Sequence, residues 1–539
     1  MKTKRMNGVL SDDAWIWLRR NDGRIWHVRV YHPFTPHWNR RLHRGQACYE
    51  KIMTKGENMK SSKKKLLIGL GIAFFTILTG CSFNQAPDQD KVSSTPSELK
   101  GKNSLPIPPL LEDKNPADDV AEFYLKAQKS TKSFLDGVET ESYGYNGDYL
   151  GPVIKVQKGE QVNVHIKNEL GDEETTVHWH GLEVPGSADG GPHNVIKPNE
   201  IFSPSFTITQ PAATLWYHPH PLHKTGEQVY KGLAGLFYIE DEVSNQLNIP
   251  KSYGENDFPI VIQDRNLRED GQLSYDLNMM SLMHGMHGDT PLINGVFDPY
   301  LEVPQGKVRL RLLNGSNARI FQLKLNEDDN FWQIASDGGF LEKPVKMDQI
   351  VLGPAERAEM IVDFSQYKQG DKVQLFDQDI RLMNFVVGNP EKEKFEIPDQ
   401  LTTIEKINPP SGTVTRTFAF QGMGNSVNIN GKQMDMNRID EEVRLNATEI
   451  WEITNIDNGM MGGMGMPHPF HPHGVQFQIL ERNGKEPPEN EQGWKDTILL
   501  MPGDKVKTIA TFKKDGVFMY HCHILEHEDA GMMGQFEVN

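Results

Sequence analysis

Eight of the chain's 19 histidines occur in pairs whose members are separated by one residue. The pairs are His178/His180, His218/His220, His471/His473 and His521/His523. On an extended strand, residues two apart point to the same face, so each pair aims two imidazoles in one direction. Imidazole suits copper, zinc, iron and nickel, and eight imidazoles are too many for one ion. The pattern therefore predicts a cluster of about three transition-metal ions.

A second metal site is predicted around Cys522, which stands between His521 and His523. On a strand its sulfur points away from the two imidazoles. His468, His527 and Met532 lie nearby in the sequence. One thiolate, two imidazoles and a weak thioether are the ligand set of a blue-copper electron-transfer site. Electrons entering at the sulfur would reach the cluster through a few covalent bonds of the same strand.

The elements that must hold these residues are short strands. The chain has 539 residues, 48 Gly and 33 Pro, which favours several turn-rich β domains. Segments such as 153–156 and 162–166 alternate at the strand period of two. A faint repeat recurs at 156–168, 303–314 and 448–455, a plausible domain spacing. We expect three similar β-sandwich domains, at 116–245, 246–405 and 406–539. The first and third carry the histidine pairs, so the cluster should lie between them.

The first hundred residues indicate export. Met59–Cys81 combines a lysine-rich start, an apolar run and small residues before a cysteine, as in a bacterial lipoprotein signal. Cys81 would be lipid-modified and would hold the protein at the outer face of the cell membrane. An uncleaved membrane anchor is the alternative. We interpret residues 1–58 as a non-native upstream extension and residues 82–115 as a flexible tether.

The charge of the chain limits its possible binding partners, and its cysteine content limits its possible disulfide bonds. Residues 1–65 hold 16 Lys and Arg against 5 Asp and Glu, whereas the whole chain has a net charge of −16. The remaining body is therefore strongly acidic, which argues against nucleic acid and would attract cations. Of the three cysteines, only Cys522 would remain as a thiol after export and lipidation, so no intramolecular disulfide is expected.

Four motifs together resemble the multicopper oxidases, and most closely the bacterial copper-efflux oxidases and bacterial laccases. They are HWHG at 178–181, WYHPH at 216–220, HPFHPHG at 468–474 and HCHILEHEDAGMM at 521–533. The resemblance implies an all-β chain of three cupredoxin-like Greek-key β-sandwich domains. It also implies four coppers per chain, one of type 1, one of type 2 and two of type 3. Such an enzyme couples one-electron oxidation of a substrate to four-electron reduction of dioxygen to water.

The resemblance also assigns ligands. The type 1 copper would take His468, Cys522 and His527, with Met532 as axial ligand. The type 2 copper would take His178 and His471. The type 3 pair would take two triplets of histidines, namely His180, His218 and His523, and His220, His473 and His521.

Two carboxylates would supply protons, because reducing dioxygen at a buried cluster requires a proton relay. By resemblance these are Asp189 and Glu528. Alternatively, Asp189 is only a turn residue before Gly190, and Glu528 only orients a ligand histidine.

Methionine-rich segments at 279–287 and 460–466 are the main indication of a substrate. Thioethers select Cu(I), so we expect Cu(I) oxidation in copper tolerance, with small phenols as further donors. The alternative is that these methionines pack or form a mobile loop. Rival functions are a phenol or bilirubin oxidase, a non-enzymatic relative without copper ligands, and a simple blue-copper carrier. A carrier would leave eight histidines unexplained. We expect a monomer.

Overall fold

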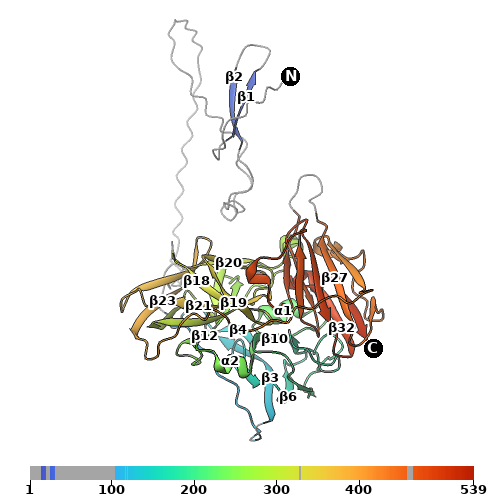
Figure 1. Ribbon diagram of the computed structural model, residues 1–539, viewed down its shortest axis with the longest axis horizontal. Coiled ribbons are helices and arrows are strands. Elements are labelled where there is room, and N and C mark those ends of the chain that lie inside the picture. Colours follow the sequence, from blue (N-terminus) through green and yellow to red (C-terminus); the bar gives the residue numbers. More distant parts are fainter. Residues whose placement is uncertain are drawn as a thin grey trace, which may run out of the picture. The chain divides into compact units, whose positions relative to one another are not determined.

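The computed structural model describes residues 14–19, 25–30, 103–115, 117, 119–326, 329–457 and 465–539 (Figure 1). The chain forms two compact units, Met1–Gln89 and Asp90–Asn539. In the first unit, β1 (Ala14–Arg19) and β2 (Ile25–Val30) pair antiparallel. The predicted signal peptide 59–81, including Cys81, lies outside the described residues. No helix in the described part of the chain is long and apolar enough to cross a membrane.

The first sandwich consists of two sheets of short strands. One sheet has the order β4-β3-β6-β8, with β9 also paired to β6, and the other has the order β5-β11-β10-β7. Helices α1 (Thr225–Tyr230) and α2 (Glu242–Gln246) accompany them. The strands are β3 (Val120–Lys132), β4 (Thr140–Tyr145), β5 (Ile154–Gln157), β6 (Gln161–Glu169), β7 (His178–His180), β8 (Ile201–Phe202), β9 (Ser205–Thr207), β10 (Ala213–His218) and β11 (Gly235–Glu240).

The second sandwich pairs a seven-stranded sheet with a five-stranded one, and it includes α3 (Met279–His284). The sheet orders are β14-β13-β12-β16-β21-β18-β19 and β15-β23-β22-β17-β20. The strands are β12 (Asp257–Arg265), β13 (Thr290–Ile293), β14 (Val296–Phe297), β15 (Tyr300–Gln305), β16 (Lys307–Asn314), β17 (Phe321–Lys324), β18 (Phe331–Ser336), β19 (Gly339–Met347), β20 (Gln349–Leu352), β21 (Arg357–Asp363), β22 (Lys372–Asp377) and β23 (Ile380–Pro390).

The third sandwich has two five-stranded sheets, β25-β24-β27-β31-β29 and β26-β33-β32-β28-β30. It also contains α4 (Leu525–Asp529) and the 3-10 turns η3 (Gly424–Ser426) and η5 (Glu489–Glu491). The strands are β24 (Thr415–Gln421), β25 (Asn428–Ile429), β26 (Glu441–Val443), β27 (Thr448–Asn455), β28 (His468–Pro472), β29 (Phe477–Arg482), β30 (Ile498–Leu500), β31 (Lys505–Thr511), β32 (Gly516–Cys522) and β33 (Met533–Val538).

Alternating burial explains why these segments pair as sheets. Along β27, every second side chain is buried while the residues between are half-buried, as the strand period requires. Each sandwich buries its own apolar cluster between its two sheets. The predicted all-β class is confirmed, and Figure 1 shows the third sandwich, with β27 and β32, beside the strands of the first and second.

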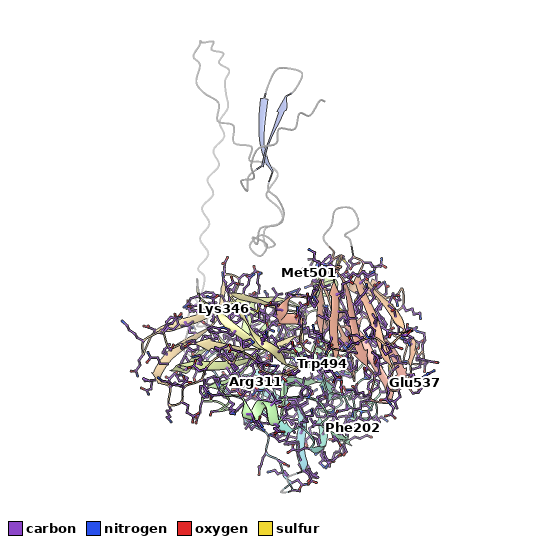
Figure 2. All side chains as sticks on the ribbon, in the orientation of Figure 1. Phe202, Arg311, Lys346, Trp494, Met501 and Glu537 are labelled. Atoms are coloured by element: carbon purple, nitrogen blue, oxygen red, sulfur yellow. The ribbon has the colours of Figure 1, made fainter. Side chains whose placement is uncertain are left out.

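The first and second sandwiches also meet through buried contacts. An apolar cluster that includes Trp216 and Leu313 joins them. Beside it, the Arg311 side chain, labelled in Figure 2, donates to Asp257 Oδ2 at 2.7 Å and to Thr214 Oγ1 at 3.1 Å. Arg311 and Asp257 belong to the second sandwich and Thr214 to the first, so a hydrogen bond from a buried ion pair crosses this boundary.

The predicted tether at 82–115 requires a correction from residue 103 onward. Leu105 is only 4% exposed, and its N–H donates to Tyr300 O at 2.8 Å. Leu111 N–H likewise donates to Val153 O at 2.8 Å. The polar composition around these residues suggested a free linker, but the leucines supply enough apolar surface to dock on the first two sandwiches.

Candidate metal centre

The first histidine of each of the four pairs lies on one of two pairs of neighbouring strands. β7 and β10 are antiparallel neighbours in the first sandwich, and their register places His178 opposite His218. β28 and β32 are antiparallel neighbours in the third sandwich, where His471 lies opposite His521. Strand pairing therefore sets the spacing of the histidines within each domain.

Only the first histidine pair lies entirely on a strand, β7. In the other three pairs the second histidine follows the end of its strand, because β10 ends at His218, β28 at Pro472 and β32 at Cys522. A proline separates the histidines in two of these pairs, and proline cannot donate to a strand ladder. The expected strand geometry thus applies to His178 and His180, whereas strand ends aim the other imidazoles.

All eight imidazoles meet in one buried cluster between the first and third sandwiches. His473 Nε2 lies 3.1 Å from His521 Nε2 within the third sandwich. His178 Nε2 lies 3.4 Å from His471 Nε2 across the domain boundary. Two ring pairs stack across the same boundary, His178 on His473 at 3.7 Å and His180 on His471 at 3.6 Å between centroids. The cluster is complete only where the two domains meet.

Burial lowers the pKa of six of the eight imidazoles and so favours their neutral form. It lowers the pKa of His220 to about 4 and that of His523 to about 3, and it places the pKa values of His180 and His218 well below the usual range of histidine. The same holds for His471 and His473, where the neighbouring imidazoles add to the effect. A neutral imidazole retains a nitrogen lone pair, which is the form that binds a metal.

Backbone carbonyls fix which ring nitrogen carries the hydrogen. His178 Nδ1 donates to Asp189 O at 2.9 Å, His218 Nδ1 to Pro219 O at 2.9 Å and His471 Nδ1 to Asp496 O at 2.7 Å. The Nε2 atoms of these rings then carry the lone pairs that face the cluster. Two such lone pairs face each other where His178 Nε2 lies 3.4 Å from His471 Nε2, and they repel each other unless a cation lies between them. Within the described part of the chain, neither nitrogen of His523 has a hydrogen-bond partner.

The second site surrounds Cys522 inside the third sandwich. Cys522 Sγ lies 3.5 Å from His468 Nδ1 and 3.9 Å from His527 Nδ1, and all three side chains are fully buried. Burial raises the pKa of the Cys522 thiol far above its usual value, so thiolate formation requires a positive partner such as a metal. Met532 is buried in the same core, and its backbone bonds to both Cys522 and His527.

The outer nitrogens of the two histidines in this site are also held. His468 Nε2 lies 3.1 Å from Asp457 Oδ2, and His527 Nε2 donates to Met283 O at 3.1 Å. Both rings therefore turn the lone pair of Nδ1 toward the sulfur. Met283 belongs to α3, so the first methionine-rich segment covers this site.

Asp189 lies at the end of the turn after the first histidine pair and also contacts the cluster. Its Oδ2 accepts a hydrogen bond from His473 Nδ1 at 2.8 Å, and its backbone oxygen accepts from His178. Among the described residues, Oδ1 has no partner. Asp189 is therefore more than a turn residue.

Glu528 lies on α4 between two imidazoles of the cluster. Its Oε2 lies 3.1 Å from His521 Nδ1 and its Oε1 lies 3.5 Å from His220 Nδ1. Burial alone would raise the pKa of Glu528, but the neighbouring His220 and His521 lower it to about 2. The carboxyl is ionised at neutral pH even though it is only 1% exposed.

Comparison with known proteins agrees with this geometry. Family models described as multicopper oxidase match residues 126–244 and 401–539. The multicopper oxidase mco of Staphylococcus aureus is 46% identical over 441 residues, which is 81% of this chain and 93% of that protein. The chain belongs to the multicopper oxidase family.

Two further relatives extend the comparison. A laccase from Pediococcus acidilactici superposes with a TM-score of 0.78 at 42% identity, covering 82% of this chain and 95% of that one. The cell division protein FtsP of Escherichia coli is 35% identical over 460 residues, or 81% of this chain and 92% of that protein. In the described part of this chain, the buried histidine cluster and the Cys522 site are the two candidate metal sites of the oxidase.

The residues present fit the copper of a multicopper oxidase. Neutral imidazoles with converging lone pairs suit a cluster of borderline ions, and a thiolate with two imidazoles suits copper in particular. Bound metal cations would give the unpartnered nitrogens of His523 a partner and would stabilise the buried thiolate of Cys522. This enzyme is an oxidase that uses dioxygen as electron acceptor.

Three residues of the centre were missed at the level of sequence. Asp457 and Asp496 hold ligand histidines, and Arg357 holds Asp496. Asp496 and Arg357 lie far from every histidine motif in the chain, so only folding brings them to the centre. Asp457 lies eleven residues before His468 and carried no distinguishing spacing.

The two methionine-rich segments differ in how much of each the structure describes and in how exposed their methionines are. In the first, Met279 and Met280 are 74% and 53% exposed, so they do not pack in a core, whereas Met286 is buried. Most of the second, residues 460–464, lies outside the described residues, but Met466 is buried, with its Sδ 2.9 Å from His284 Nδ1. The segments therefore meet beside the Cys522 site.

Proposed function

We propose that this multicopper oxidase oxidises Cu(I) and thereby contributes to copper tolerance. The observation that carries the proposal is the contact between His284 Nδ1 and Met466 Sδ at 2.9 Å. A thioether and an imidazole together form a soft pair that suits Cu(I). Met283 directly precedes His284, and its backbone oxygen accepts a hydrogen bond from His527, a predicted ligand of the Cys522 site. A cuprous ion held by His284 and Met466 would therefore be connected to that site through one residue and one hydrogen bond.

The acidic surroundings support a cationic donor. The chain has a net charge of −16, and Asp457 lies at the same end of the site, bonded to His468. Burial would raise the pKa of Asp457, but hydrogen bonds from His468 and Gly422 lower it, so its carboxylate is ionised. Cations are drawn to such a region, whereas neutral phenols gain nothing from its charge.

Four coppers per chain are part of the proposal. The type 1 ion would be held by His468, Cys522 and His527 with Met532, and the type 2 ion by His178 and His471. The type 3 ions would be held by His180, His218 and His523, and by His220, His473 and His521. The short nitrogen–nitrogen distances support this grouping, because they join His178 to His471, His180 to His218, and His521 to both His220 and His473.

Bound copper would supply the electron transfer, and the chain's own residues would supply geometry and protons. Cys522 and the histidines on either side of it belong to one strand end, so a single backbone segment connects the two sites. Glu528 contacts two imidazoles and Asp189 a third, and both carboxylates are buried beside the cluster. We assign them the acceptance and passing of protons to dioxygen as it is reduced to water.

The proposal sets this activity at the outer face of the bacterial cell membrane. The lipoprotein-type signal at 59–81 supports export and lipidation of Cys81. A monomer is sufficient, since every ligand comes from one chain. Cys81→Ser should release the protein from the membrane fraction, and continued sedimentation with membranes would contradict the lipid anchor.

A steady-state comparison of Cu(I) with a small phenol tests the substrate. Met466→Leu and His284→Ala should each lower kcat/KM for Cu(I) roughly 10-fold, about 1.4 kcal/mol, and leave phenol oxidation unchanged. Met383→Leu, a buried change in the second sandwich, is the control. Equal losses for both donors would contradict a cuprous site at this pair. Phenol oxidation remains the second candidate, favoured by the 42% identity with a laccase.

A further inference from the structure

The second sandwich supplies none of the predicted copper ligands, yet one of its side chains reaches the cluster. Arg357, the first residue of β21, is fully buried. Its Nη1 donates to Asp496 Oδ1 at 2.7 Å and its Nη2 to Asp496 Oδ2 at 2.6 Å. This two-pronged contact is the strongest form of an arginine–carboxylate pair, and it fixes the plane of the carboxylate.

Asp496 in turn contacts two imidazoles of the cluster from different domains. Its Oδ1 lies 3.1 Å from His180 Nε2, and its backbone oxygen accepts from His471 Nδ1 at 2.7 Å. The two rings are stacked at 3.6 Å and nearly parallel, at 9°. One aspartate therefore holds the hydrogens on the outer nitrogens of both rings, which leaves their other nitrogens free to bind metal.

Arg357 uses all five of its N–H groups in this position. Besides the two bonds to Asp496, it donates to the backbone oxygens of Thr214, Ala355 and Asp337 at 3.0–3.1 Å. Thr214 belongs to the first sandwich and Asp496 to the third, so the guanidinium joins all three domains. A lysine has three donors on a single atom and cannot reproduce this pattern.

Two neighbours close the remaining space around the pair. Gln476 Nε2 donates to Asp496 Oδ2 at 2.7 Å and also to Gly181 O at 2.9 Å. Gly181 has a φ of +88°, and a Cβ there would collide with the Asp496 carboxylate and crowd Arg357. The glycine that ends the HWHG motif is thus required by the aspartate–arginine pair.

We infer that Arg357 is a positioning residue for the trinuclear site. By holding Asp496, it orients His180 and His471, and so controls how firmly the type 2 ion and one type 3 ion are bound. The inference rests on the proposed copper assignment. It gives the second sandwich, which supplies none of the ligands of the four predicted coppers, a role in holding the trinuclear site.

A purely structural role for Arg357 is the competing explanation, and Arg311 is the matched control. Arg311 is also a buried arginine of the second sandwich, forms a two-pronged contact with Asp257 and contacts Thr214. Its contacts do not include a histidine of the cluster. Replacing either arginine with lysine breaks a buried two-pronged contact with an aspartate. Only Arg357→Lys should also disturb the metal site.

The test compares copper-loaded wild type, Arg357→Lys, Arg311→Lys and Asp496→Asn. The readouts are copper per chain, blue absorbance, the type 2 electron paramagnetic resonance signal and the loss of copper to a chelator. Arg357→Lys and Asp496→Asn should keep the blue absorbance, shift the type 2 signal and weaken copper retention about 10- to 100-fold. Arg311→Lys should retain copper like wild type.

The inference is overturned if Arg357→Lys and Asp496→Asn match Arg311→Lys in type 2 signal and copper retention. Should Arg357→Lys fail to fold, Asp496→Asn decides alone, because it preserves side-chain shape. A wild-type protein without a type 2 signal would instead contradict the copper assignment, so the two failures are distinguishable.

Discussion

The Cys522 site and the eight-histidine cluster share a strand but are built in different ways. His468, Cys522, His527 and Met532 all come from the third sandwich, on β28, β32, α4 and the turn before β33. The cluster takes half of its histidines from the first sandwich and half from the third, and Arg357 of the second helps to hold it. One site can form within a single domain, whereas the other requires the assembled molecule. The two sites should therefore fail independently.

Removing the sulfur should have the largest effect. Cys522→Ser should abolish the blue absorbance and substrate oxidation, because the strong thiolate ligand of the type 1 ion is lost. The cluster should keep its copper, since no cluster ligand changes. Absorbance spectra and metal analysis check this, and a blue Cys522→Ser protein would exclude this residue as the ligand.

Breaking the cluster from the first sandwich should give the reverse result. His178→Ala should reduce oxygen consumption to background and remove the type 2 signal. The blue absorbance should persist, because the first sandwich contributes no ligand to the Cys522 site. Loss of the blue absorbance together with oxygen consumption would show that the two sites do not form separately.

Replacing the carboxylate of Glu528 should have a smaller effect. Glu528→Gln should lower kcat for oxygen reduction about 10²- to 10⁴-fold, the usual contribution of a positioned acid–base group. Glu526→Gln on the same helix is the control, because Glu526 is buried but bonds to Tyr275 and Asn317 rather than to the cluster. Full copper content with full turnover in Glu528→Gln would remove it from proton transfer.

The axial position should give the smallest effect. Met532→Leu should raise the potential of the type 1 copper, because a weak sulfur ligand that stabilises the oxidised ion is lost. Copper content of the cluster should not change. Redox titration followed by the blue absorbance measures the shift, and an unchanged potential would argue against Met532 as axial ligand.

The sequence predicted those features that depend on repeated patterns or on residues close together in the chain. The His-x-His pairs and the cysteine between two histidines carry their chemistry in adjacent residues, and period-two alternation indicated the strands of all three sandwiches. It could not reveal Arg357 or Asp496, because their role depends on contacts between domains that no local pattern records. Docking of residues 103–115 was likewise missed, since three leucines and one isoleucine between prolines and polar residues give little periodic signal.

The Met-rich segments show a similar limit. Their composition suggested soft-metal binding, but only the fold shows that α3 covers the Cys522 site through the bond from His527 to Met283. The partner of Met466 is His284, which is 182 residues away along the chain. A sequence pattern can supply the residue types of such a site, whereas the three-dimensional arrangement selects its members.

The central claim is that one strand end serves two copper sites, with sulfur on one side and two imidazoles on the other. Copper analysis of the purified protein, combined with absorbance and paramagnetic resonance spectra, tests it most directly. The account predicts about four coppers per chain, with a blue type 1 band and a separate type 2 signal. A colourless protein that binds one copper or none after full loading would contradict it.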